Sequence, residues 1–166
     1  IGGIDYPTSG SIIIDGNEIQ AMSEDELAIF RRRNLGIVYQ FYNLIPILNV
    51  EENMAIPMEL DGRKVEKAQM DDMLLRLGLT ERRTHLPNEL SGGQQQRTSI
   101  GRALITRPSI VLADEPTGNL DTSNEIMHLL KTSNRELNQT IIMITHNMEL
   151  AKAADRTIMI EDGKIR

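Results

Sequence analysis

Short apolar runs alternate along the chain with segments in which apolar residues recur at helical spacing. The runs predict buried strands, and the periodic segments predict helices with one apolar face. Strands are expected at 12–14, 36–39, 110–113 and 141–144, and helices at 24–33, 65–77, 123–137 and 148–154. Strands that alternate with helices are typical of an α/β protein with a parallel sheet.

Turn and cap residues mark the ends of these elements. Ser23 followed by Glu26 forms a capping box ahead of one helix, and Gly78 is a suitable C-cap for another. A tight turn is expected at 15–17 and a final hairpin around 158–163. Strand signals fade between 41 and 89, which predicts an inserted helical subdomain. We therefore expect a single domain over 1–166, with an α/β core at 1–42 and 105–166 and a helical subdomain at 43–104.

Composition excludes several classes of protein. The 166 residues are 40% apolar, which suits one domain, and the net charge of −6 argues against binding nucleic acid through its phosphates. The absence of cysteine removes disulfides and thiolate metal sites and suits a reducing compartment. The longest apolar runs fall far short of the roughly 20 residues that cross a bilayer.

The first candidate for chemistry is the start of a helix at Ser91, Gly92, Gly93 and Gln94. Ser91 and Gln94 fit a capping box, and two glycines let an anion approach free backbone N–H groups at the positive end of the helix dipole. Phosphate is the first ligand to consider. An ordinary capped helix is the alternative that this motif leaves open by itself.

A second candidate is the acidic pair Asp114 and Glu115, which ends the strand expected at 110–113. Ligands bind at the carboxyl ends of strands in open α/β sheets. Because side chains alternate along an extended segment, we expect Asp114 to bind Mg²⁺ and Glu115 to orient the water that attacks a terminal phosphate. A polar strand end without a ligand is the alternative.

Two further strand ends deliver side chains to the same edge. His146 follows the strand at 141–144 and could donate to a γ-phosphate oxygen. Gln40 follows the strand at 36–39, and its amide could bind both Mg²⁺ and water. Each is weak evidence alone, but three strand ends and one glycine-opened helix indicate the same chemistry.

These residues resemble the motifs of the nucleotide-binding subunits of ATP-binding cassette transporters. The segment Leu90-Ser91-Gly92-Gly93-Gln94 is similar to the family signature, and Ile110 to Glu115 is similar to the Walker B strand with its catalytic acid. Gln40, Asn119-Leu120-Asp121 and His146 correspond to the Q-loop, the D-loop and the switch histidine. The stretch 36–60 resembles the subgroup that serves lipoprotein release, macrolide efflux and antimicrobial-peptide resistance.

The resemblance implies a fold, ligands and partners. It implies a P-loop NTPase sheet and two subunits that bind two ATP molecules with Mg²⁺, head to tail. Ser91, Gly92, Gly93 and Gln94 would contact the ATP held by the partner, and Asn119 and Asp121 would lie between subunits. The region Phe41 to Leu44, with the helical subdomain, would meet a transmembrane permease. The protein is then expected in the cytoplasm, on the inner face of the cell membrane.

One motif of the family does not occur in the sequence. There is no G-x-x-x-x-G-K-[ST], whose backbone and lysine cradle phosphates. The segment 1–10 resembles the stretch just after the helix that this loop opens. We therefore expect a truncated cassette whose first strands and P-loop helix lie outside the chain, with the P-loop within about 20 residues upstream of Ile1. The chain alone is expected to be inactive.

Two other functions remain open at this point. A soluble cassette ATPase of DNA repair or translation would share the signature. The net negative charge of the chain and the short spacing from Gln40 to Gln94 disfavour this function. A non-catalytic interaction module is the other alternative. The transported substrate cannot be read from these residues.

Overall fold

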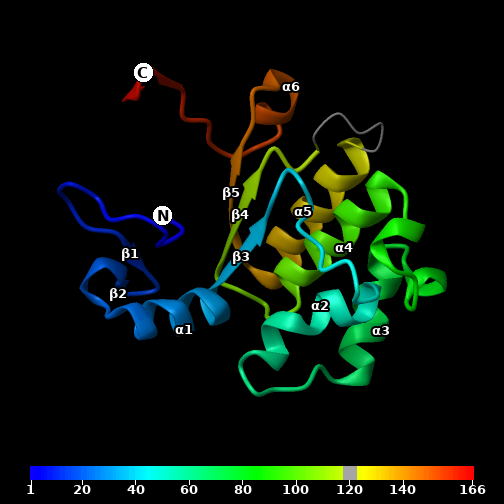
Figure 1. Cartoon of the computed structure of the whole chain (residues 1–166). Coiled ribbons are helices and arrows are strands. Elements are labelled where there is room, and N and C mark those ends of the chain that lie inside the picture. Colours follow the sequence, from blue (N-terminus) through cyan, green and yellow to red (C-terminus); the bar gives the residue numbers. More distant parts are fainter. Residues whose placement is uncertain (118–122) are drawn as a thin grey trace.

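A three-stranded parallel sheet lies at the centre of the fold (Figure 1). The computed structural model describes residues 1–117 and 123–166. Strand β4 (Ile110–Asp114) lies between β3 (Leu35–Val38) and β5 (Thr140–Ile144), and both pairings are parallel. The predicted parallel α/β sheet is confirmed.

Six α-helices and two small hairpins complete the described part of the chain. The helices are α1 (Glu24–Asn34), α2 (Val50–Glu59), α3 (Lys67–Arg76), α4 (Gly92–Leu104), α5 (Ser123–Leu137) and α6 (Met148–Ala151). The hairpins are β1 (Ile13–Ile14) with β2 (Asn17–Glu18), and β6 (Ile160–Glu161) with β7 (Lys164–Ile165). Single 3-10 turns occupy Ile19–Ala21, Thr80–Arg82 and Pro87–Glu89. Among the described helices, none is both long and apolar enough to cross a membrane.

Local hydrogen bonds explain where the helices begin and end. The capping box of Ser23 and Glu26 opens α1, as the sequence predicts. Asn49 and Glu52 form a further capping box that opens α2, in the segment 41–89 for which the sequence predicts only a helical subdomain. Gly78 has a φ of 63°, a left-handed conformation that glycine adopts without strain, and it ends the α3 segment as expected.

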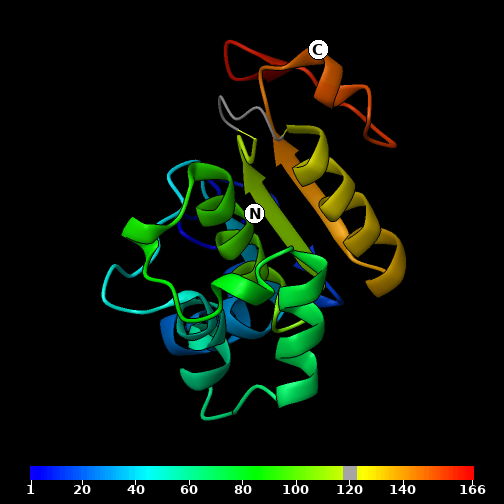
Figure 2. The same ribbon diagram turned by 90° about the vertical axis from the view of Figure 1, so that its right-hand side faces the viewer.

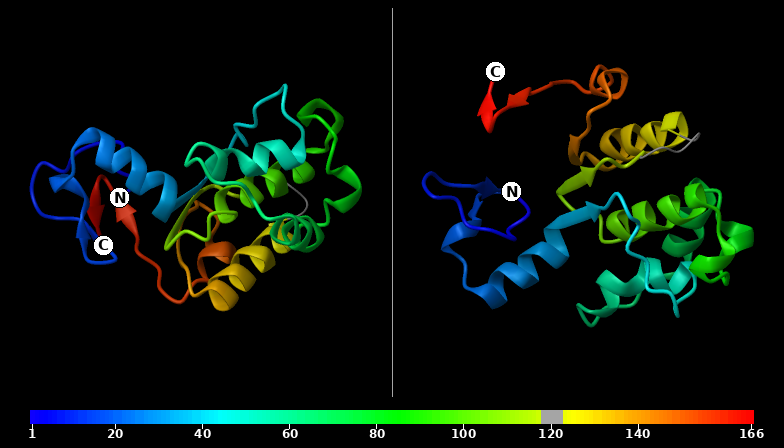
Figure 3. Two further views of the ribbon diagram at one scale, coloured as in Figure 1. Left: turned by 90° about the horizontal axis from the view of Figure 1, so that it is seen from below. Right: turned by 45° about the horizontal axis from the view of Figure 1, so that its top comes forward.

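Helices α2 to α5 lie away from the two hairpins, whereas α1 lies beside β1 and β2 (Figure 1). Helix α4 packs on β3, and α5 packs on β5. Figure 2 shows α5, in yellow, running along the strands on their right, with α2 and α3 to their left. Both hairpins lie on the opposite side of the molecule from α2 and α3 in each view (Figure 3). The carboxyl ends of the strands therefore remain open at one edge.

The main hydrophobic core joins the sheet to the helical segment without a break. Buried side chains from β3, β4 and α2 to α5 form one cluster that includes Val38, Met54, Leu74, Ile100, Val111 and Ile126. A smaller cluster of Ile14, Ile19, Leu27, Phe30 and Leu35 joins α1 to β1, to the 3-10 turn at Ile19–Ala21 and to β3. The division into an α/β core and a helical subdomain at 43–104 stays a prediction.

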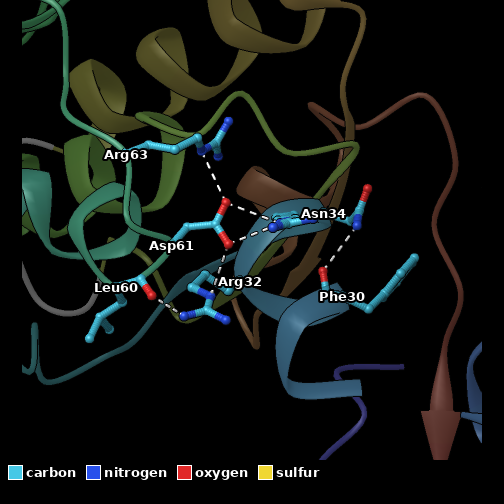
Figure 4. Close-up of polar contacts among 7 residues, drawn as sticks. Phe30, Arg32, Asn34, Leu60, Asp61 and Arg63 are labelled. Atoms are coloured by element: carbon cyan, nitrogen blue, oxygen red, sulfur yellow. Dashed lines mark hydrogen bonds and ion pairs between the residues drawn. The ribbon is translucent and has the colours of Figure 1, made fainter. Parts of the chain in front are cut away.

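An ion cluster connects α1 to the loop that follows α2 (Figure 4). The carboxylate of Asp61, whose side chain is 4% exposed, accepts two hydrogen bonds from Arg33 Nε at 2.9 and 3.0 Å. Arg63 Nε lies 3.0 Å from Asp61, Arg32 Nε lies 3.5 Å away, and Arg32 also donates to the carbonyl of Leu60. The hydrogen bond from Arg33 lowers the pKa of Asp61, against the opposing effect of burial, and the other arginines add to the lowering.

Two glycines allow the backbones of the core to approach closely. A Cβ at Gly36 on β3 would overlap the carbonyl oxygen of Ala103 on α4. A Cβ at Gly101 would come within 2.6 Å of Met54 Cε and 2.7 Å of Leu77 Cδ1. A backbone carbonyl cannot move aside, whereas the end of a methionine side chain can.

We expect Gly36→Ala to destabilise the protein more than Gly101→Ala. Overpacking against the α4 backbone should cost about 1–3 kcal/mol of unfolding free energy. At Gly101 the displacement of Met54 is partly offset by the better helix propensity of alanine, which is about 1 kcal/mol. Urea titration followed by circular dichroism measures both variants, and equal losses would contradict the close approach of β3 and α4.

We expect Asp61→Asn to lower the thermal midpoint in a pH-dependent way. The pKa of Asp61 is lower in the folded than in the unfolded chain, so its stabilising effect is complete above the unfolded value of about 3.9 and is lost as pH falls through the folded pKa. The difference from wild type should therefore be largest near neutrality and shrink in acid. Asp72→Asn, which removes an exposed pair with Arg76, is the matched control.

Candidate functional site

The parallel register brings three strand ends to one edge of the sheet. Val38 lies opposite Ala113, and Asp114 lies opposite Ile144. The side chains that directly follow these pairs are therefore neighbours. Glu115 directly follows β4, and Gln40 and His146 come two residues after β3 and β5, so all three follow the carboxyl ends of neighbouring strands; of the three, Glu115 and His146 are in contact.

Glu115 is held by the segment that follows β5. Its N–H donates to Ile144 O at 3.0 Å. Its carboxylate accepts the His146 N–H at 2.8 Å and the Thr145 hydroxyl at 3.1 Å. His146 Nδ1 also lies 2.7 Å from Glu115 Oε1. A left-handed φ of 42° turns this residue back toward β5, a strained conformation that these hydrogen bonds support.

These contacts keep the carboxylate charged. Burial raises the pKa of Glu115, but the hydrogen bonds from the backbone and side chain of His146 and from Thr145 outweigh it, so the pKa lies below its usual range. Only 17% of the Glu115 side chain is exposed, whereas 87% of the His146 side chain is exposed. The site thus holds a fixed, ionised acceptor beside an imidazole that is free to turn outward.

Asp114 and Gln40 are both exposed at the same edge. Neither takes part in the hydrogen bonds around Glu115, and among the described residues no group of three histidine, cysteine or acidic side chains could hold a metal ion. Their carboxylate and amide oxygens suit Mg²⁺, which proteins commonly bind through one or two side chains together with substrate phosphates. The two residues fit that type of site.

The start of α4 carries hydrogen-bond donors that have no acceptor among the described residues. Ser91 Oγ accepts the Gln94 N–H at 3.3 Å, and Gln94 Oε1 accepts the Ser91 N–H at 2.9 Å, which confirms the predicted capping box. Both bonds use oxygen acceptors, so the Ser91 hydroxyl proton and the Gln94 amide protons remain available. The N–H groups of Gly92 and Gly93 have no acceptor in the described ranges. The helix start is therefore rich in donors, as an anion site requires.

Two side chains that were not predicted hold the loops around this site. Arg102 on α4 donates to the carbonyls of Tyr42, at 2.7 Å, and Asn43, at 2.5 Å, both of which have left-handed φ angles. Thr145 anchors Glu115. Neither stood out in the sequence, because each acts on a segment distant along the chain.

Phe41, in the expected permease region 41–44, is 80% exposed. Asn119 and Asp121 of the expected D-loop lie outside the described residues.

Comparison with known proteins decides the family. Residues 1–118 match the family model described as ABC transporter. The chain belongs to the ABC transporter family. It is 44% identical to a lipoprotein-releasing system ATP-binding protein, LolD, of Bacteroides thetaiotaomicron, an alignment that covers 100% of this chain and 78% of the relative. A LolD 1 protein of Chlorobium chlorochromatii is also 44% identical, over 99% of this chain and 69% of its own.

A further relative and a solved structure extend this finding. The ABC transporter ATP-binding protein YtrE of Bacillus subtilis is 45% identical over 100% of this chain and 74% of its own. The dimeric cassette MJ0796, solved in a post-hydrolysis state with ADP and Pi, superposes with a TM-score of 0.88 at 39% identity, over 99% of this chain and 75% of that one. The expected P-loop NTPase fold and the placement in the lipoprotein-release subgroup are confirmed, and the enzyme class is that of an ABC-type ATPase.

We expect His146→Ala to raise the pKa of Glu115 toward its ordinary value. The variant removes the imidazole from Oε1 but keeps the backbone N–H, so part of the lowering should remain. A ¹³C NMR titration of the glutamate carboxyls measures the change. His128→Ala, which removes an exposed imidazole on α5, is the control and should leave the titration of Glu115 unaltered.

Proposed function

We propose that this chain provides the ATP-hydrolysing residues of an ABC transporter subunit, with Glu115, His146 and Gln40 as its catalytic residues. The observation that carries the proposal is the Glu115 carboxylate, which is held charged at the end of β4 by His146 and Thr145. Hydrolysis of ATP needs an acceptor that orients a water in line with the γ-phosphate. A carboxylate that is already fixed and ionised performs this without rearrangement.

His146 is proposed to act on the γ-phosphate itself. Its ring lies against Glu115 on one side and is otherwise open to solvent. A rotation of the side chain would take the imidazole away from Glu115 and offer an N–H to a phosphate oxygen. The backbone N–H of His146 would continue to hold the carboxylate, so the water-orienting group would keep its place.

Asp114 and Gln40 are proposed to hold Mg²⁺. Both present oxygen atoms at the edge where the phosphates would lie. The ion would neutralise charge on the phosphate oxygens. Gln40 adds a ligand without a further negative charge, which suits a site that already contains two carboxylates.

Ser91, Gly92, Gly93 and Gln94 are proposed to bind the ATP of a second subunit. The free N–H groups and side-chain donors at the start of α4 support this role. Two structures of the cassette MJ0796 are dimeric, and one of them is bound to ADP and Pi. In a head-to-tail dimer each helix start would face the nucleotide of the partner, and Asn119 and Asp121 would lie between the subunits.

A membrane permease is the second proposed partner. The loop 41–44 and the helical subdomain would meet it, and the exposed side chains of Phe41 and Ile47 give this region an apolar surface. The names of the relatives support a role in lipoprotein release. We place the protein on the cytoplasmic face of the membrane as part of this proposal. The net charge of −6 gives no support to a role on nucleic acid.

We expect Glu115→Gln to reduce kcat for ATP by at least about a hundredfold while ATP binding is retained, because the amide cannot replace an ionised acceptor. The test uses the chain extended at its N-terminus by the P-loop segment of a family member, with phosphate release and nucleotide-dependent dimerisation as the measurements. The variant should accumulate as an ATP-bound dimer. The 166-residue chain without the extension is expected to bind Mg-ATP weakly and serves as the blank.

A matched control keeps this test specific. Glu125→Gln changes an exposed glutamate that pairs with Arg97, and it should leave kcat within about twofold of the parent. Hydrolysis by Glu115→Gln at the parent rate would refute the assignment of Glu115.

A further inference from the structure

Gln96 is a polar side chain in the middle of the core. It lies on α4, two residues beyond Gln94, and is 1% exposed. Its Nε2 donates to the carbonyl of Pro116 at 2.6 Å. Its Oε1 has no partner within the described residues. A buried amide that is only half satisfied destabilises a fold, so packing alone does not explain a glutamine at this position.

The accepting carbonyl belongs to the residue that follows Glu115. Pro116 is buried and has no N–H, so its carbonyl is its one backbone hydrogen-bonding group. On the other side, Glu115 N–H is tied to Ile144. The segment that carries the Glu115 carboxylate is thus held from β5 at one residue and from α4 at the next.

The helix that supplies this second contact also carries the anion-binding start. Ser91 to Gln94 form its first turn, and Gln96 lies in its second turn with its side chain directed at the β4 end. An α-helix transmits a small displacement along its axis as a rigid rod, because every backbone group is bonded within it. A shift at the helix start therefore reaches Pro116 through Gln96.

We propose that Gln96 is a positioning residue that couples the signature helix to Glu115 of the same chain; the proposal rests on the proposed function. When the start of α4 engages a phosphate on the partner subunit, Gln96 holds the loop after β4 so that the carboxylate of Glu115 keeps its orientation.

The first test measures the local effect on the 166-residue chain. Gln96→Met keeps the length and the burial of the side chain and removes the donor. Amide hydrogen exchange at Glu115 and His146 should become faster in Gln96→Met. Gln95→Met is the matched control, since Gln95 is the neighbouring glutamine and donates to Leu90 O instead. Unchanged rates of hydrogen exchange at both amides in Gln96→Met would overturn the proposal. This outcome does not depend on whether the proposed ATPase function is correct.

The second test measures turnover in the P-loop-extended chain. Gln96→Met should lower kcat by about ten- to a hundredfold with little change in KM, as expected for a misplaced reacting group, and Gln95→Met should stay within about twofold. Gln96→His offers a ring N–H to Pro116 and should recover most of the loss. A loss confined to KM, or a histidine variant no better than methionine, would overturn the coupling.

Two further outcomes separate this proposal from the function on which it rests. Full activity in Gln96→Met together with an inactive Glu115→Gln would refute the coupling and leave the function standing. Hydrolysis that survives Glu115→Gln would refute the function instead. If the methionine variant does not fold, Gln96→Asn, whose amide stops one methylene short of Pro116, gives the same comparison in a polar side chain and should show the same loss of kcat.

Discussion

The parallel pairing of β4 between β3 and β5 is the constraint on which the site depends. Both edges of β4 are paired, and Val111 and Ala113 are buried beneath the helices. This register fixes where each strand ends, so Gln40, Glu115 and His146 arrive at one edge through backbone hydrogen bonds. The sheet thus sets the positions of these side chains, and the hydrogen bonds from His146 and Thr145 then orient the carboxylate of Glu115.

Helix α4 is the second constraint, since it contacts the segments that follow both β3 and β4. Its start offers N–H donors at Gly92 and Gly93. Further along, the backbone near Ala103 lies so close to β3 that Gly36 cannot carry a Cβ, and Arg102 binds the carbonyls of the loop that follows β3. One helix therefore sets the position of the β3 end and contacts the β4 end, while its first turn presents free N–H donors. Such a helix is suited to link binding at its start to chemistry at the sheet edge.

Much of this arrangement could be predicted from local sequence patterns. The capping boxes at Ser23 and Ser91, the apolar runs of β4 and β5 and the C-cap at Gly78 depend on neighbouring residues, and each was found where it was expected. The strand ends then follow from the rule that parallel strands end at one edge. The roles assigned to Glu115, His146 and Gln40 stay predictions.

Contacts between distant segments could not be predicted in this way. Gln96 and Pro116 are 20 residues apart, Arg33 and Asp61 are 28 apart, and Arg102 and Tyr42 are 60 apart. Each donor lies on a helix whose periodicity indicates only a polar or an apolar face, and nothing local names the acceptor. These same contacts hold the loops around the site. Sequence patterns therefore indicate the proposed catalytic residues more readily than the residues that orient them.

The side chains at the site differ in how far they are exposed to solvent, and the difference has a physical reason. Glu115 is held by its neighbours before any ligand is present, whereas Asp114, Gln40 and the ring of His146 are open to solvent. A group that orients water gains most from being fixed in advance, because any reorganisation during the reaction would add to the barrier. Side chains that bind a nucleotide or its metal ion can be ordered when the ligand binds, because the ligand forms ion pairs and hydrogen bonds with them. The chain therefore fixes in advance the carboxylate that is proposed to orient water, and leaves the proposed ligand-binding groups exposed.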